Sequence, residues 1–184
     1  FLSAVLGVKT NIIGLIEGIA EATSSVLKVF SGWLSDKLKS RKALTVAGYA
    51  ISALAKPFFY LASTWEAVAA IRWADRVGKG IRTAARDALL ADDVKEEHRG
   101  LAFGLHRAAD TAGAMLGLLI AAFVVWRVQA GSAALKEQTF RTIVLISMIP
   151  AFLAVLVLAF GAKEVKPSGE AQKTRITFKG LGKN

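Results

Sequence analysis

The sequence predicts an all-α transmembrane protein with five spanning helices, and three observations support this prediction. Of its 184 residues, 54% are hydrophobic, and a mean hydropathy of +0.46 is high for an ordinary soluble domain. The apolar residues form blocks close to the roughly 20 residues that a helix needs to cross a bilayer. Basic residues gather in alternate links between these blocks. A soluble helical bundle with an unusually apolar core is the alternative that the block lengths disfavour.

Five apolar blocks define the predicted helices. The last block, 142–162, contains no charged residue, and the block 43–62 contains only Lys56. The predicted helices cover residues 11–34, 43–62, 65–88, 101–126 and 142–162. Residues 1–8 are apolar but too short to span, so we expect them to be the end of a preceding helix, and the chain to be a piece of a longer protein. Trp33, Trp65 and Trp126 fall at predicted helix ends, where interfacial aromatic residues are common.

The distribution of lysine and arginine predicts the orientation of these helices. Twelve of these residues lie at one end and in the tail: Lys37, Lys39, Arg41, Lys42, Lys95, Arg99, Lys163, Lys166, Lys173, Arg175, Lys179 and Lys183. Four lie at the opposite end: Lys9, Arg127, Lys136 and Arg141. Because basic links stay on the cytoplasmic side, we expect residues 36–42, 92–99 and the tail 163–184 to be cytoplasmic. The net charge of +10 therefore requires no nucleic-acid partner.

Charged residues inside the predicted helices indicate a polar interior. Each ionised side chain at the centre of a bilayer costs roughly 2.5–3.5 kcal/mol on insertion scales. The helix 65–88 carries four such residues within an arc of about 100°: Arg72, Asp75, Arg76 and Lys79. Arg82 and Arg86 continue that face toward the cytoplasmic end. These side chains must therefore face protein or water rather than lipid.

Three other predicted helices carry polar stripes at helical spacing. In the helix 11–34 and just beyond it, the stripe consists of Glu17, Glu21, Ser24, Lys28, Ser31 and Ser35. A weaker stripe on 43–62 consists of Thr45, Tyr49, Ser52 and Lys56, and the helix 101–126 carries His106 and Asp110 beside Gly113 and Gly117. Four such helices predict a shared hydrated cavity, unless the charges only join helices to one another. The candidate cavity residues are Glu17, Glu21, Lys28, Lys56, Arg72, Asp75, Arg76, Lys79, His106 and Asp110.

Three motifs resemble those of the major facilitator superfamily. The segment Gly32-Trp-Leu-Ser-Asp36-Lys37-Leu-Lys-Ser-Arg41-Lys42 is similar to the loop pattern G-x-L-x-D-R-x-G-R-R between helices two and three of that family. It departs at Lys39 and Ser40, where the family has glycine and arginine. Arg76-Val-Gly-Lys-Gly80 resembles the R-x-x-x-G pattern of helix four. The run from Asp110 to Gly117 keeps the glycine spacing of helix five but lacks its proline.

The resemblance implies a secondary transporter of twelve helices in two halves, with the substrate site between the halves. Residues 1–162 would be the N-terminal half with helix one truncated, and 163–184 a cytoplasmic linker. The run 75–91 resembles a prokaryotic subgroup, which implies the cytoplasmic (inner) membrane. The implied partners are a small-molecule substrate, the lipid bilayer and the C-terminal half of the same transporter. The implied activity is transport of a small solute by alternating access with ion, most simply proton, coupling.

The resemblance also implies roles for individual residues. The loop motif acts in the family as a cytoplasmic gate, and the residues assigned to the gate here are Gly32, Asp36, Lys37, Arg41, Lys42, Arg86 and Asp87. Asp36 and Arg41 are expected near the cytoplasmic end of the fourth helix of the family, with Asp87 as a candidate acidic partner. Arg76 matches the family arginine associated with proton coupling. No enzymatic activity, cofactor or metal is expected.

Two alternatives come from other functional classes. A membrane-embedded enzyme acting on lipid-linked or phosphorylated substrates could grip phosphate with Arg72, Arg76 and Lys79, but no nucleophile or metal cluster converges with them. The sequence has two histidines and no cysteine, and Gly78-Lys-Gly lacks the spacing of a phosphate loop. A non-transporting scaffold leaves the inward charges unexplained.

The charges predicted to lie deep in the bundle bear on the substrate. Six are positive: Lys28, Lys56, Arg72, Arg76, Lys79 and Arg107. Four are negative: Glu17, Glu21, Asp75 and Asp110. The positive surplus favours an anionic or zwitterionic substrate.

The predicted orientation can be tested by chemical labelling. The chain contains no cysteine, so single cysteines at Ser40 and Ser132 would be the only reactive thiols in it. We expect a membrane-impermeant maleimide to label the two positions from opposite sides of the membrane, because one lies in a basic link and the other in the sparsely charged link at the opposite end. Labelling of both positions from the same side would contradict the predicted topology.

Overall fold

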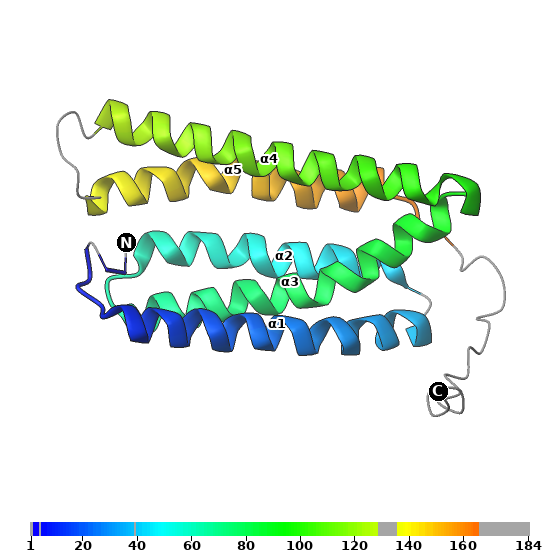
Figure 1. Ribbon diagram of the computed structural model, residues 1–184, viewed down its shortest axis with the longest axis horizontal. Helices are drawn as coiled ribbons and strands as arrows, with labels where there is room; N and C mark the ends of the chain where they lie inside the picture. Colours follow the sequence, from blue (N-terminus) through cyan, green and yellow to red (C-terminus); the bar gives the residue numbers. More distant parts are fainter. Residues whose placement is uncertain (1, 4, 39, 129–135, 166–184) are drawn as a thin grey trace, which may run out of the picture.

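The computed structural model describes residues 2–3, 5–38, 40–128 and 136–165 as a bundle of five long helices (Figure 1). In chain order these are α1 (Thr10–Leu38), α2 (Arg41–Leu61), α3 (Trp65–Asp93), α4 (Arg99–Val128) and α5 (Glu137–Gly161), with a single 3-10 turn, η1 (Glu96–His98), before α4. The described residues contain no strand. The predicted all-α class is confirmed.

Consecutive helices run antiparallel (Figure 1). The links from α1 to α2 and from α3 to α4 lie at one end, together with residues 162–165 that follow α5. We call this the loop-motif end, because it carries residues 36–42. The link from α2 to α3 lies at the opposite end, as do the last turn of α4 and the first turn of α5. All links predicted to be cytoplasmic therefore share one end, although the tail beyond residue 165 is outside the described residues.

The helices are longer than the apolar blocks that predicted them. α1 continues to Leu38, α3 continues to Asp93, and α5 begins at Glu137 rather than at 142. The extra turns include charged residues, and an ion pair between Arg141 and Glu137 at 2.6 Å lies on the first turn of α5. The apolar block marks the part of a helix suited to hydrocarbon, whereas the helix itself continues into the aqueous boundary.

The segment before α1 differs from the prediction. Its described residues form turns, with the Val8 N–H donating to the Leu2 carbonyl at 2.9 Å. Gly7 has a φ of 64°, a left-handed conformation that interrupts a right-handed helix. The expected helix end is therefore replaced by a glycine turn that leads into α1.

Three helical segments of the described chain are long and apolar enough to cross a membrane by composition alone: Arg41–Leu61, Glu96–Val128 and Glu137–Gly161. α1 and α3 are long enough, at 29 residues each, but their charges lower the hydropathy. Five spanning helices therefore require the charges of α1 and α3 to be neutralised inside the bundle.

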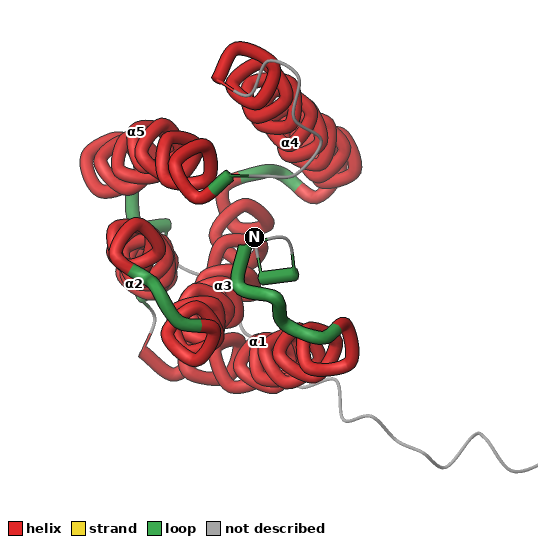
Figure 2. Tube along the Cα trace, turned by 90° about the vertical axis from the view of Figure 1, so that its left-hand side faces the viewer, coloured by secondary structure: helices red, strands yellow, loops and turns green. Residues whose placement is uncertain are grey.

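α3 is the central helix of the bundle and packs along both α1 and α2. α5 packs against α2, whereas α4 makes few contacts with α3 and α5 and stands to one side in the view along the long axis (Figure 2). Glycine 113 and glycine 117 of α4 face open space, since a Cβ added at either would meet nothing within 4 Å. The predicted glycine pattern of α4 therefore has no packing partner in the described chain.

Glycines on α3 allow its neighbours to approach closely. A Cβ added at Gly80 would lie 2.7 Å from the Cβ of Leu27 and 2.8 Å from the Ser24 carbonyl oxygen on α1. A Cβ added at Gly78 would lie 2.6 Å from the Ser52 hydroxyl on α2. Both distances are too short for any side chain, so these positions determine how near α1 and α2 come to α3.

The outward faces of the bundle are apolar. Large hydrophobic side chains with more than half of their surface exposed occur on all helices except α3, for example Val29 at 75%, Leu118 at 72% and Phe160 at 85%. A water-soluble protein seldom exposes so much continuous apolar surface. This surface suits contact with lipid acyl chains.

The close approach at Gly80 gives a prediction about the sign of a mutational effect. Alanine normally stabilises a helix by about 0.8–1 kcal/mol over glycine. At Gly80 we expect Gly80→Ala to lower the melting temperature of the full-length protein in detergent, because overpacking costs about 1–3 kcal/mol. The control is Gly14→Ala on α1, where an added Cβ meets nothing within 4 Å and the melting temperature should not fall. Equal effects at both positions would contradict the packing described here.

Candidate functional site

Five charged side chains form a continuous series of ion pairs between α1 and α3. Arg72 donates from Nε to Oε1 of Glu17 at 2.7 Å and from Nη2 to Oε2 at 3.1 Å. Arg76 lies between the two carboxylates, 3.6 Å from Glu17 and 3.2 Å from Glu21. Lys79 ends the series, with its Nζ 3.4 Å from Glu21. We call these five residues the ion-pair ladder.

The helical periodicity of both helices produces this arrangement. Glu17 and Glu21 are one turn apart on α1, and the three cations are spaced by four and three residues on α3, so each set lies on one face. The Thr64 side chain accepts a hydrogen bond from the Ala67 N–H at 3.3 Å and caps the start of α3. Ser24 on α1 sits against Gly80, directly after Lys79, which brings the two faces within the reach of their side chains.

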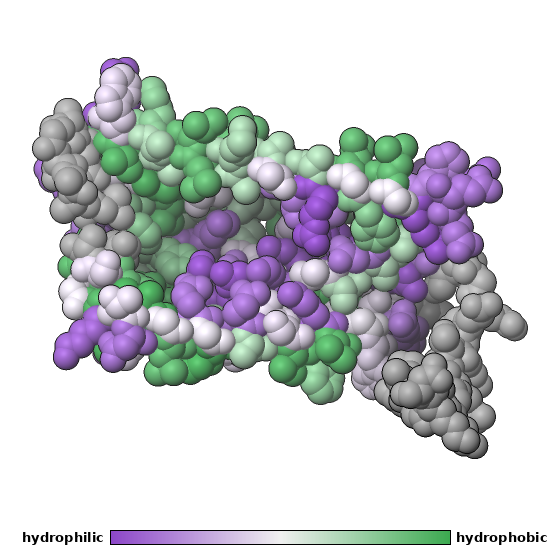
Figure 3. All heavy atoms as spheres, viewed as in Figure 1, coloured by the Kyte–Doolittle hydropathy of each residue, from purple (hydrophilic) through white to green (hydrophobic). Residues whose placement is uncertain are grey.

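The ladder is open to the surroundings. The exposed fractions of its side chains are 41% for Glu17, 48% for Glu21, 36% for Arg72, 17% for Arg76 and 34% for Lys79. Figure 3, drawn from the same side as Figure 1, shows hydrophilic residues gathered near the middle of the bundle with hydrophobic residues above and below them. Glu17 and Arg72 also line a cavity of about 340 Å³ whose other walls include Ile13, Phe59, Val68 and Phe140.

The serines of the predicted α1 stripe do not line this cavity. Ser24, Ser31 and Ser35 are at most 4% exposed, and the Ser31 hydroxyl donates to the Ile81 carbonyl of α3. Lys28 lies close enough for its charge to act on Glu21. The stripe thus combines two roles, because its carboxylates belong to the ion-pair ladder and its serines are buried.

The weaker stripe on α2 also packs against α3. Thr45 and Ser52 are 1% and 6% exposed, and the Ser52 hydroxyl donates to the Asp75 carbonyl at 3.1 Å. Arg82 is directed toward α2 instead of the ladder. It donates to the Ser52 hydroxyl at 2.6 Å, and its guanidinium carbon lies 4.5 Å from the centre of the Tyr49 ring. Ser52 of this stripe therefore lies in a helix contact, whereas Tyr49 also lines a cavity.

Four predicted cavity residues lie apart from the ladder. Within the described chain, the ladder forms no ion pair with Lys56, Asp75 or Asp110. Lys79 and Asp75 are one turn apart on α3, but Lys79 pairs with Glu21 of α1. His106 lines a separate cavity of about 580 Å³ near the loop-motif end, together with Arg86 and Tyr49. In the described residues, Glu17 and His106 therefore line different cavities, and one cavity shared by all four stripes stays a prediction.

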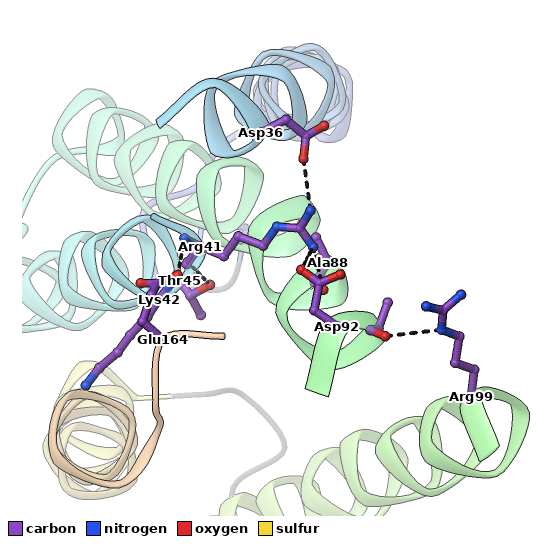
Figure 4. A network of polar contacts seen from close by, with 9 residues as sticks. Asp36, Arg41, Lys42, Thr45, Ala88, Asp92, Arg99 and Glu164 are labelled. Atoms are coloured by element: carbon purple, nitrogen blue, oxygen red, sulfur yellow. Dashed lines mark hydrogen bonds and ion pairs between the residues drawn. The ribbon is translucent and has the colours of Figure 1, made fainter. Parts of the chain in front are cut away.

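The loop motif forms a second cluster, centred on Arg41 (Figure 4). Its guanidinium group donates from Nη2 to Asp36 at 3.1 Å and from Nη1 to the Ala88 carbonyl at 2.8 Å, and it pairs with Asp92. Arg41 and Asp92 are each only 11% exposed, whereas Asp36 is 68% exposed. One arginine thus joins the end of α1 to the end of α3.

The acidic partner differs from the one that we expected. Asp87 pairs with its neighbour Arg86 at 3.1 Å, and Asp92 takes the place at Arg41. Five residues along a helix correspond to a rotation of about 140°, so Asp87 points away from α2 when Asp92 points toward it. Of the other gate residues, Lys37 lies 5.0 Å from the centre of the Trp33 ring, and Gly32 packs against Ala84.

Sequence reasoning missed one member of this cluster. Glu164, just past α5, accepts hydrogen bonds from the backbone N–H groups of Arg41 and Lys42. An acidic residue in a basic tail carries no periodic signal, and its partner lies more than a hundred residues away in the chain. The sequence gives no signal for this contact, because serine is a favourable cap residue, and only the structure shows that Ser40 makes no side-chain cap hydrogen bond.

Comparisons with known proteins place the chain among transporters. The sequence profile of the family described as Major Facilitator Superfamily matches residues 1–182. An MFS-type transporter of Methanocaldococcus jannaschii, itself uncharacterised, is 34% identical over 171 residues, which cover 93% of this chain and 41% of the relative. Uncharacterised proteins of Mycobacterium bovis and Mycobacterium tuberculosis are each 36% identical over 121 residues, or 66% of this chain and 30% of the relative. The chain thus spans less than half the length of these relatives, and no solved structure matches it.

The ladder geometry predicts an energetic coupling between α1 and α3. We expect a double-mutant cycle of Glu17→Gln and Arg72→Gln to give a coupling energy of about 1 kcal/mol in thermal unfolding, because the pair is bidentate but partly exposed. The control is the pair Glu137 and Arg141 on one turn of α5, for which about 0.3–0.5 kcal/mol is expected. A ladder pair that couples no more strongly than the control pair would contradict its role in joining the helices.

Proposed function

Because the chain belongs to the major facilitator superfamily, we propose that it is the larger part of the N-terminal half of a secondary transporter. The transporter moves a small solute across the cytoplasmic membrane of a prokaryote by alternating access. The remaining helices, including the C-terminal half, would complete the substrate site. The single observation that carries this proposal is the ion-pair ladder, which places five ionised groups inside a bundle whose outer faces are apolar.

The exposure of the ladder favours a binding role over a purely structural one. Charges that serve only to hold membrane helices together are expected to be fully paired and shielded, because an unpaired ionised group in hydrocarbon is costly. In the ladder, four of the five side chains are a third to a half exposed. A cavity of about 340 Å³ adjoins Glu17 and Arg72, within the size range of sites for small ligands. Partial exposure to a cavity leaves room for a solute to replace one of the pairs.

The pairing pattern supports an anionic or zwitterionic substrate. Each carboxylate of the ladder lies between two cations, whereas Arg72 and Lys79 at its ends each contact one carboxylate. The unused capacity is therefore for hydrogen-bond donation, and a carboxylate or phosphate group of the solute would match it.

The same pattern suggests how an ion could couple to the solute. Glu17 and Glu21 compete with a bound anion for the guanidinium group of Arg76. Protonation of either carboxylate removes its charge and frees a cation of the ladder for the solute. Binding of a proton and binding of an anion would then favour each other, which is the requirement for their movement in the same direction.

The Arg41 cluster is proposed to act as the cytoplasmic gate of this transporter. Arg41 joins α1 to α3 at the loop-motif end, and Asp36 keeps 68% of its side chain exposed. An exposed carboxylate held by a fixed arginine is available to meet the other half of the transporter. Opening of the gate would break the contact to that half and leave the cluster itself intact.

The proposal can be tested with the full-length protein in liposomes and a panel of small anions, zwitterions and cations. We expect uptake or exchange of at least one anionic or zwitterionic solute. Arg76→Gln should lower the rate roughly tenfold or more, because a charge-assisted hydrogen bond contributes about 1.5–3 kcal/mol. The control is Arg127→Gln, since Arg127 lies at the far end of α4 beside Phe123 and Trp126.

Three outcomes would count against the proposal. Uptake of cations alone would contradict the assigned substrate charge. Chemical conversion of a panel compound would favour the membrane-embedded enzyme. No movement of any solute across a broad panel, with correctly folded protein, would favour the scaffold.

A further inference from the structure

Glu164 makes an unusual long-range contact at the loop-motif end. It lies three residues beyond the end of α5 at Gly161. Its Oε1 accepts a hydrogen bond from the Arg41 N–H at 2.7 Å, and both carboxylate oxygens lie within 3.2 Å of the Lys42 nitrogen. Figure 4 shows this carboxylate against the first turn of α2. A residue of the segment after α5 therefore contacts the backbone of the loop motif.

The contact satisfies backbone N–H groups at the start of α2. The first N–H groups of a helix have no partner within the helix, and the usual side-chain acceptor at the cap position is absent because Ser40 makes no such bond. Glu164 supplies the acceptor from outside the helix, and its negative charge is favourable at the positive end of the helix dipole.

The contact also connects Glu164 to the other partners of Arg41. Arg41 uses its side chain to hold Asp36 of α1 and Asp92 and Ala88 of α3. It uses its backbone N–H to hold Glu164. The ends of α1, α2, α3 and α5 therefore meet at a single residue, and Glu164 is the member that adds α5.

We propose that Glu164 is a positioning residue for the cytoplasmic gate. By holding the first turn of α2, it fixes the backbone from which the Arg41 side chain reaches α1 and α3, and it makes the end of α5 move together with the gate. This inference rests on the proposed transport function for its consequence, but the contact can be tested without transport. The opposite possibility is that Glu164 only caps α2.

Two substitutions in the full-length protein separate these possibilities. Glu164→Ala removes the cap and the connection to α5 together. Ser40→Asp adds an acidic residue at the cap position of α2, and in the Glu164→Ala background it restores a cap without restoring the connection. The control is Glu96→Gln, which removes an exposed acid from η1 at the same end of the bundle.

The first measurement reports on the contact itself. Spin labels on cysteines introduced at Ala43 and Ala162 give the distribution of distances between the start of α2 and the end of α5. We expect a narrow distribution in the parent and in Glu96→Gln, and a broad one in Glu164→Ala with or without Ser40→Asp. A distribution that stays narrow in Glu164→Ala would overturn the inference, whether or not the protein transports any solute.

The second measurement compares stability with the transport rate in liposomes. Glu164→Ala should lower the melting temperature and change the transport rate about fivefold, the kinetic equivalent of one capping contact. Adding Ser40→Asp should recover the melting temperature but not the rate. Recovery of both would show that Glu164 is only a cap and would overturn the inference. Absence of transport in the parent protein would count against the proposed function and leave the distance measurement to decide on Glu164.

Discussion

The neutralisation of charges between α1 and α3 is the constraint on which the rest of this structure depends. Each ionised group at the centre of a bilayer costs roughly 2.5–3.5 kcal/mol, and neither helix is apolar enough to span by composition alone. The ladder of Glu17, Arg72, Arg76, Glu21 and Lys79 lets the two helices enter hydrocarbon as a pair. That pairing determines the register of α1 on α3 and the face that each helix turns to the other. It also determines the position of the cavity beside Glu17 and Arg72.

The small residues around the ladder serve the same constraint. Ion pairs of 2.7–3.6 Å require helix backbones near enough for side chains to meet. Gly80 and Ser24 allow that approach on α1, and Gly78 and Ser52 allow it on α2. The R-x-x-x-G motif therefore joins two functions in five residues, because Arg76 carries the charge and Gly80 permits the contact that neutralises it.

The sequence predicted the helices and the charged faces because both depend on periodicity. Glu17 and Glu21 were placed with Arg72, Arg76 and Lys79 from the spacing of each set. Periodicity could not say which polar stripe faces a neighbouring helix, so the stripe that contains Ser52 indicates a shared cavity, although Ser52 contacts Asp75 and Arg82 of α3. Nor could it choose between Asp87 and Asp92, since that choice depends on how α3 is rotated against α2. The contact of Glu164 depends on tertiary proximity alone.

The separation of the ladder partners along the chain has a consequence for biosynthesis. Glu17 and Arg72 are 55 residues apart, which at about 5–20 residues per second corresponds to roughly 3–11 s of translation. During that interval the ribosome has delivered two carboxylates to the membrane but none of the cations that neutralise them. We therefore expect nascent α1 to remain in a water-filled or protein-lined site of the insertion machinery until α3 has been synthesised. α5, whose residues 142–161 include no charged side chain, can enter the lipid as soon as it is made.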